Sequence, residues 1–288
     1  MTNEPDGSAR NENTHQHVLE DIERNLSGDL CFPTFLDLAM QVRKTLKNPE
    51  APLDEIAQSI LVDPLMASRI LGLANSPAHN HSGRTTARFK TAIEQLGQET
   101  VRATSLNLAT DQIMKSKNLA AFDEFAKLNW EHSIRSAVIA RELALPIGHI
   151  NPDEAMLAGL VHDIGIFYLF YCASEYAEYR DDLDKLITLV LGWHERVGED
   201  VLRALGMPEE ICASVCNHDR PRLEDVEIKN MNDIVYVANL LAGSNWEWLP
   251  NSISAAEKAA INKTRFRYAA ARETAEKDIQ KLLATLNS

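Results

Sequence analysis

The sequence has little positive charge for its length. Its 288 residues include 29 Lys and Arg against 42 Asp and Glu, which gives a formal net charge of −13. Nucleic-acid backbones are bound by basic faces. The balance therefore excludes a large nucleic-acid footprint, although a small basic pocket for a nucleotide remains compatible with it.

Signals for export or membrane insertion are also lacking. The polar start MTNEPDGSARNENTHQH is neither a signal peptide nor a transit peptide. No run approaches the roughly 18–20 uninterrupted apolar residues of a membrane span, since the richest stretch, 164–172, is too short. The four cysteines form no CxxC motif, so reduced thiols are expected. These absences predict a cytoplasmic protein without membrane contact.

Strand signals are missing as well, because no sustained alternation and no hairpin turn pair occurs. Apolar residues instead recur at three- and four-residue spacing. Among the expected helices are 65–75, which begins at Asp63-Pro64, then 87–96 and 99–114, and finally one long helix or a helix pair over 254–286. Breaks are expected at 146–152, around Gly192, at 206–208 and at 218–224. The pattern predicts an all-α fold.

Four segments are expected along the chain. Residues 1–16 are predicted to be disordered because they are polar. An N-terminal helical lobe over 17–118 and a second helical lobe over 119–250 follow. Residues 251–288 form a C-terminal helical extension.

Metal-capable side chains occur in a suggestive order in the second lobe. They are His132, the pair His162-Asp163, His194 and His218. Imidazole and carboxylate groups are the usual ligands of Zn, Fe and Mn, and carboxylates also suit Mg. Neighbouring residues lie about 100° apart on a helix, so both could reach one ion only under close packing. Gly159 and Gly165 flank the pair and would permit such packing.

This order resembles the HD superfamily of metal-dependent phosphohydrolases, and more closely its HDOD (HD-related output domain) branch. The likeness spans about 30–245 and includes ILGLANS at 70–76, TAIEQLG at 91–97, EHS at 131–133, LAGLVHDIG at 157–165, WHE at 193–195 and GMPEEI at 206–211. The resemblance implies a two-lobed all-α fold and a role in bacterial signal transduction, where HDOD proteins mostly act as regulatory or interaction modules.

Two departures from the active hydrolases concern catalysis. Asn239 stands where the superfamily pattern has a late ligand aspartate, and Asp233 is a candidate substitute. Ile166 stands where related phosphodiesterases carry a lysine that could stabilise phosphate charge.

We therefore predict a non-catalytic HDOD regulatory protein that acts through a signalling protein partner, with a metal or nucleotide bound at the HD site. No receiver, kinase or cyclase domain is evident, so action in trans is expected. One alternative is a metal-dependent phosphohydrolase that uses Fe, Mn, Zn or Mg at His132, His162, Asp163, His194 and His218. The other is that these histidines only pack the core.

Overall fold

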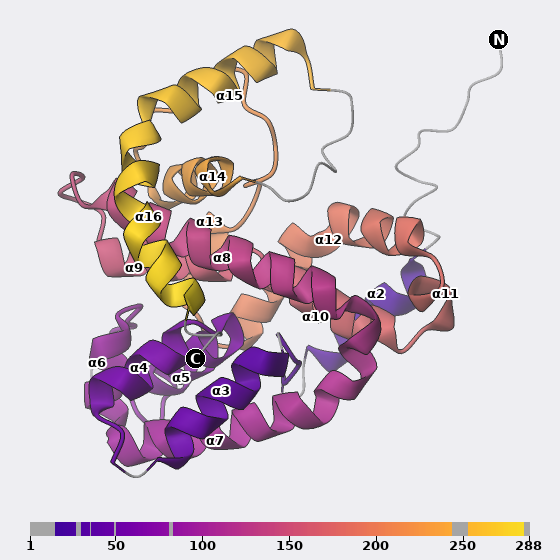
Figure 1. The fold of residues 1–288 in the computed structure, drawn as a ribbon, viewed down its shortest axis with the longest axis vertical. Coiled ribbons are helices and arrows are strands. Elements are labelled where there is room, and N and C mark those ends of the chain that lie inside the picture. The colour runs from indigo at the N-terminus through magenta and orange to yellow at the C-terminus, as the bar shows by residue number, and fades with distance from the viewer. Residues whose placement is uncertain are drawn as a thin grey trace.

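The computed structural model describes residues 15–26, 30–34, 36–48, 50–80, 83–243 and 253–284. Residues 1–14 of the segment predicted to be disordered lie outside this part. Within it, all regular structure is helical and no strand occurs, so the all-α prediction is confirmed. The helices form two stacked groups, and the last helix descends from the upper group towards the lower one (Figure 1).

The helices of the lower group in Figure 1 come from the first half of the chain. They are α3 (Leu36–Lys47), α4 (Leu53–Leu61), α5 (Pro64–Asn75), α6 (Phe89–Leu96) and α7 (Gln98–Lys115). A 3-10 helix, η1 (Ser116–Phe122), leads from α7 to the second group. The first described helix, α2 (Gln16–Asn25), packs against α10 of the second group.

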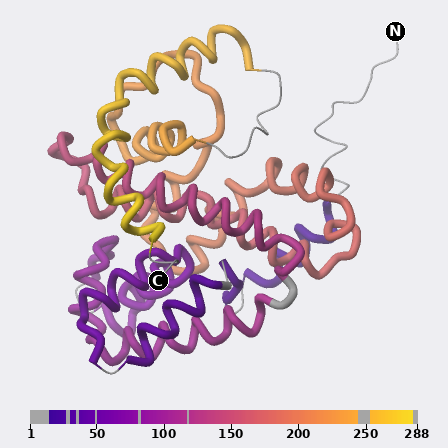
Figure 2. The backbone as a smooth tube through the Cα atoms, viewed as in Figure 1, coloured from indigo at the N-terminus to yellow at the C-terminus, as the bar shows by residue number. Residues whose placement is uncertain are grey.

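The second group carries most of the core and all the candidate ligands. It comprises α8 (Asp123–Ala144), α9 (Pro152–Val161), α10 (Ile164–Ser174), α11 (Ala177–Arg180), α12 (Leu183–Ala204), α13 (Glu209–Ser214) and α14 (Met231–Ala242). The predicted C-terminal helical stretch is a pair, α15 (Ala255–Arg267) and α16 (Ala269–Leu283). The tube view shows α16 descending along α8 towards the lower group (Figure 2). The predicted division of the chain into four segments stays a prediction.

Two helix starts that the sequence predicted are capped by a side chain. The carboxylate of Asp63 accepts hydrogen bonds from the backbone N–H groups of Leu65 and Met66 at the start of α5. Asn151 caps α9 in the same way, and Pro152 follows it at the first helical position. The predicted start at Asp63-Pro64 and the break over 146–152 are thus confirmed.

The predicted break around Gly192 is wrong. Helix α12 runs through it without interruption for 22 residues. Glycine costs only about 1 kcal/mol in a helix, and the apolar face that α12 buries on α10 outweighs this amount. Gly192 itself is exposed, and a Cβ there would meet no atom within 4 Å.

One apolar stretch is longer than the uninterrupted run at 164–172 that the sequence indicated. Pro152–Ser174, through α9 and α10, could cross a membrane by length and composition, with a mean hydropathy of 1.6 in its most apolar window. The helices Leu53–Leu61 and Pro64–Asn75 meet the same criterion only as a pair bent by 115°. In Pro152–Ser174, 89% of that window is buried inside the protein. Its hydrophobicity is therefore that of a core helix.

The two groups are joined by buried contacts. The indole N–H of Trp130 on α8 donates a 2.7 Å hydrogen bond to the carbonyl oxygen of Val62, between α4 and α5. Gly72 on α5 lies so close to the end of α12 that a Cβ would overlap the carbonyl oxygen of Leu205. Both contacts involve backbone atoms, so they fix the distance between the groups.

The capping residue Asp63 makes stability depend on pH. Burial raises the pKa of its carboxyl group to about 6, from an ordinary value of 3.8. Between these two values the folded protein holds a proton that the unfolded chain releases, so wild-type stability falls as pH rises through this window. In Asp63→Asn the cap oxygen is kept and this decline is absent. We expect the free energy of unfolding of the variant, relative to wild type, to rise by about 2 kcal/mol from pH 4 to pH 7.

Urea unfolding at intervals across this pH range measures the effect. Asp54→Asn, at an exposed carboxyl in the first turn of α4, is the matched control. A constant difference between wild type and Asp63→Asn at every pH would contradict the prediction.

Candidate metal centre

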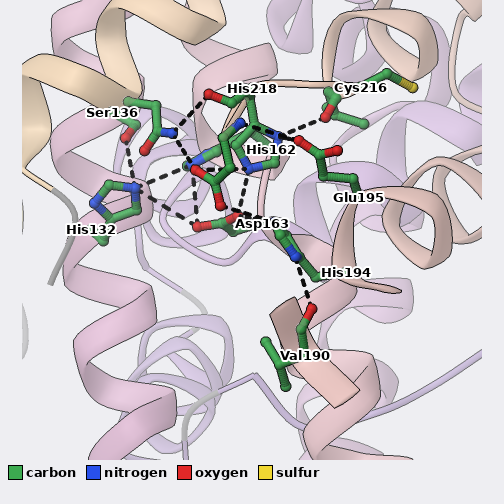
Figure 3. Close-up of polar contacts among 12 residues, drawn as sticks. His132, Ser136, His162, Asp163, Val190, His194, Glu195, Cys216 and His218 are labelled. Atoms are coloured by element: carbon green, nitrogen blue, oxygen red, sulfur yellow. Dashed lines mark hydrogen bonds and ion pairs between the residues drawn. The ribbon is translucent and has the colours of Figure 1, made fainter. Parts of the chain in front are cut away.

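The pair His162-Asp163 lies in the turn between α9 and α10. Helix α9 ends at Val161 and α10 begins at Ile164, so His162 is the C-cap of one helix and Asp163 the N-cap of the next. A turn removes the 100° separation that a continuous helix would impose on neighbours. Both side chains are consequently directed into the same buried centre (Figure 3).

The structure brings all five predicted ligands together. His132 comes from α8, His194 from α12, and His218 from the loop that follows α13. They form two sets of three around a common member: His132, His162 and Asp163, then Asp163, His194 and His218. Within each set the ligand atoms lie within 4.8 Å of one another. None of the five residues is more than 4% exposed.

All four imidazole rings are oriented by backbone carbonyl groups. The Nδ1 atoms of His132, His162, His194 and His218 lie 3.1, 2.8, 2.9 and 2.6 Å from the carbonyl oxygens of Gly243, Gly159, Val190 and Val215. A carbonyl oxygen only accepts, so Nδ1 carries a proton in each ring. The other nitrogen, Nε2, is then directed to the centre as the ligand atom.

In the first set, two nitrogen atoms face each other. Nε2 of His132 lies 3.2 Å from Nε2 of His162, and Oδ2 of Asp163 lies 3.7 and 3.2 Å from them. With Nδ1 protonated, two neutral rings would set lone pair against lone pair, which requires a proton or a cation between them. Two nitrogens bound to one zinc-like ion at about 2.1 Å lie about 3.0–3.4 Å apart. The arrangement fits an ion.

The second set uses the other carboxylate oxygen. Oδ1 of Asp163 lies 3.1 Å from Nε2 of His218 and 3.9 Å from Nε2 of His194. The buried Nε2 of His194 has no hydrogen-bond partner in the described residues, although Oδ2 of Asp219 is 3.2 Å away. An unsatisfied buried nitrogen directed at carboxylates is a further feature that fits a cation.

Burial and neighbouring charges together shift the pKa values of these groups. Burial, with His162 adding to it, lowers the pKa of His132 to about 4. Burial opposes ionisation of Asp163, but the contacts with His162 and His218 outweigh it and hold the pKa of this carboxyl group well below its usual range. For His218 the carboxylates of Asp219 and Asp163 outweigh burial and raise the pKa to about 10. A metal ion held by Asp163 and His218 would replace the proton between them.

One acidic residue at the centre was missing from the predicted ligands. Asp219 contacts His194 through Oδ2, and its Oδ1 accepts a 2.7 Å hydrogen bond from Nδ2 of Asn239. Nδ2 of Asn239 also lies 3.2 Å from the carbonyl oxygen of His218, to which it donates. Asn239 thus holds the loop at 218–219 from behind. The sequence signal for Asp219 was its place directly after His218.

The candidate substitute Asp233 lies elsewhere. Its carboxylate pairs with Arg222 at 2.6 Å and accepts a hydrogen bond from the backbone of Lys229. Those partners belong to the loop before α14, so the suggestion that Asp233 replaces the missing aspartate is wrong.

Two glycines set the spacing of the centre, as their position beside the pair predicted. A Cβ on Gly159 would lie 2.7 Å from the carbonyl oxygen of Ser136 on α8, the helix of His132. A Cβ on Gly165 would overlap the carbonyl oxygen of His194 on α12 and lie 2.6 Å from the backbone nitrogen of Gly198. The two helices that carry other ligands are therefore in backbone contact with the turn.

The fold and the site together define an all-α protein with a buried His/Asp centre of the HD type. The sequence model of the HDOD domain matches residues 32–221. The chain therefore belongs to the HDOD family.

Solved structures share the fold. The MmoQ response regulator of Methylococcus capsulatus is 22% identical, with 82% of this chain and 94% of that chain covered and a TM-score of 0.62. A virulence factor of Campylobacter jejuni is 20% identical, with 92% and 97% covered and a TM-score of 0.50. No match was found among the curated proteins.

Proposed function

We propose that this HDOD protein is a signalling module without hydrolase turnover, whose state depends on a divalent metal held by His132, His162, Asp163, His194 and His218. The observation that carries the proposal is the common orientation of the four histidines. Each is fixed through Nδ1 by a backbone carbonyl, and each directs Nε2 towards Asp163. Core packing alone needs no such convergence of polar atoms.

The chemistry of the ligands limits the choice of metal ion. Four imidazole nitrogens and one shared carboxylate suit Fe, Mn or Zn, whereas Mg prefers oxygen ligands. A divalent ion would supply positive charge beside Asp219 and lower the pKa of a water bound to it. Ser136 lies 3.4 Å from Nε2 of His132, and Glu195 accepts a 3.1 Å hydrogen bond from the backbone of Asp219. Both side chains stabilise the arrangement of the ligands.

Two residues argue against turnover. Ile166, in the first turn of α10, is buried and provides no positive charge where the resembling phosphodiesterases have a lysine. Asn239 uses its amide as a donor to Asp219 and His218. The output of the module would then be contact with a signalling protein in the cytoplasm. A response regulator is among the proteins with this fold.

A metal-dependent phosphohydrolase is the second candidate, and Asp219 favours it. Asp219 provides a carboxylate next to His194. The superfamily pattern has its late ligand aspartate at the position of Asn239 instead. Its side chain is 37% exposed, so the centre is open to solvent at this edge.

Elemental analysis of purified protein tests the proposal. We expect about one to two ions per chain in wild type after reconstitution with Mn²⁺, Fe²⁺ or Zn²⁺, because two ligand sets share Asp163. His162→Ala should lower the content by about tenfold or more, because it removes a ligand and leaves His132 without its neighbour. His149→Ala, at an exposed histidine, is the matched control.

The other outcomes separate the readings. Wild type that carries no stoichiometric metal and gains none on reconstitution would refute both metal-based functions. Hydrolysis of bis(p-nitrophenyl) phosphate that disappears in His162→Ala would establish the phosphohydrolase. If His162→Ala lowers stability and leaves metal content unchanged, the histidines only pack the core.

A further inference from the structure

A cavity of about 320 Å³ adjoins the open edge of the metal centre. His218, Asp219 and Asn239 form the side of the cavity next to the metal centre. Much of the remaining lining comes from α15, which belongs to the C-terminal extension and lies outside the matched residues 32–221. The volume is within the usual range of small-molecule sites.

One face of α15 borders the cavity. The lining residues Lys258, Ile261, Asn262 and Arg265 follow one another at positions i, i+3, i+4 and i+7, which share one side of a helix. Helix α15 is also held by the loop at 225–228. There the backbone nitrogen of Val226 donates a 2.9 Å hydrogen bond to the hydroxyl of the buried Thr264.

The position of α15 is reinforced at its end. The hydroxyl of Tyr268 accepts a 3.2 Å hydrogen bond from the backbone nitrogen of Ile228, and Arg267 pairs with Asp225. A side chain donates to or accepts from the loop at each of these points. The face that borders the cavity is therefore held in place by the loop behind it.

The face of α15 that lines the cavity carries positive charge, whereas the chain as a whole is acidic. Lys258 and Arg265 line the cavity, and within the described residues neither is in an ion pair. Among the described residues of the lining there is one carboxylate, that of Asp219, which already contacts His194. Nε of Arg265 donates a 3.2 Å hydrogen bond to the carbonyl oxygen of Leu240. That bond positions the guanidinium group and leaves its terminal nitrogens for another acceptor.

We propose that Lys258, Asn262 and Arg265 form an anion-binding wall for the phosphate of a nucleoside phosphate bound beside the metal centre. In a protein of net charge −13, two cations at one cavity without an ion-pair partner among the described residues favour a phosphorylated ligand over a cationic or neutral one. The apolar side chains of Leu240, Ile253 and Ile261 line the same cavity and would contact the nucleoside part. The inference rests on the proposed function in that the ligand meets the metal centre at Asp219.

Calorimetric titration of the full-length protein with AMP, GMP and inorganic phosphate tests the wall, with adenosine as the ligand without a phosphate. We expect AMP or GMP to bind more tightly than adenosine. Lys258→Ala and Arg265→Ala should each weaken nucleotide binding by about tenfold or more, because each removes a charge-assisted contact. Lys263→Ala removes the same charge from an exposed position on α15 that does not line the cavity, and it should bind like wild type.

Two measurements keep this inference separate from the metal proposal. Metal content is determined for every variant, and Lys258→Ala and Arg265→Ala should retain it. Equal nucleotide binding by Lys258→Ala, Arg265→Ala and Lys263→Ala would overturn the wall. So would a wild type that binds none of the three phosphate ligands with a Kd below about 1 mM. The titration needs no prior metal loading. A protein that contains no metal would refute the metal function, and its nucleotide binding would still test the anion-binding wall.

Discussion

Asp163→Asn is expected to abolish stoichiometric metal uptake and to weaken metal affinity by about 100-fold or more. Asp163 is the one residue common to both ligand sets, with Oδ2 near His162 and His132 and Oδ1 near His218. The amide keeps the shape of the side chain but removes its negative charge, and its NH₂ group cannot bind a cation. A single histidine variant affects one set, whereas Asp163→Asn affects both.

Metal analysis and the shift of the unfolding temperature on addition of Mn²⁺ or Zn²⁺ measure this effect. Asp233→Asn is the control, because it makes the same chemical change at a carboxylate that pairs with Arg222 away from the centre. It should bind metal like wild type. If Asp163→Asn still binds metal stoichiometrically, the shared carboxylate is not a ligand.

Gly165→Ala is expected to destabilise the protein by about 3 kcal/mol or more. The new methyl group would overlap the carbonyl oxygen of His194 and approach the backbone of Gly198. These are backbone atoms of α12, and no rotamer change can move them aside. Helices α10 and α12 would have to separate, and since α12 carries His194, metal affinity should fall together with stability.

Gly192→Ala on α12 provides the matched control. The same methyl group is added there at an exposed helical position with no atom within 4 Å. Alanine is the better helix former, so stability should rise by about 0.5–1 kcal/mol. Chemical unfolding of both variants measures the contrast. A Gly165→Ala protein within about 1 kcal/mol of wild type would contradict the close contact of α10 and α12.

The sequence was sufficient to predict the all-α class and those helix ends that are determined by nearby residues. Asp63-Pro64 and Pro152 determine helix starts through capping and through the fixed φ of proline, and both act within one turn. The order of the histidines was likewise informative, because each lies in a motif of its own. The close approach at Gly159 and Gly165 could be predicted from the absence of a side chain.

The remaining features depend on contacts between distant segments. Gly192 remains helical because α10 packs on α12, which a local propensity cannot include. The break at His162-Asp163 carries no proline, and the side chain of Asp163 makes no capping hydrogen bond because it is directed to the centre. The sequence has Asn239 at the position of the superfamily aspartate and Asp233 as a candidate substitute. Only the fold shows that Asp219 lies at the centre and Asp233 does not.

Because of the contact between Trp130 and Val62, two faces of helix α8 contact different groups of helices. Trp130 and His132 are two residues apart, so they point about 200° apart around the helix axis, nearly in opposite directions. His132 faces the ligands of the second group, and Trp130 donates to the backbone of the first group. One helix therefore connects the candidate metal centre to the first group, with no loop between His132 and Trp130. A displacement of α8 that moved His132 would also move Trp130 relative to the backbone of Val62.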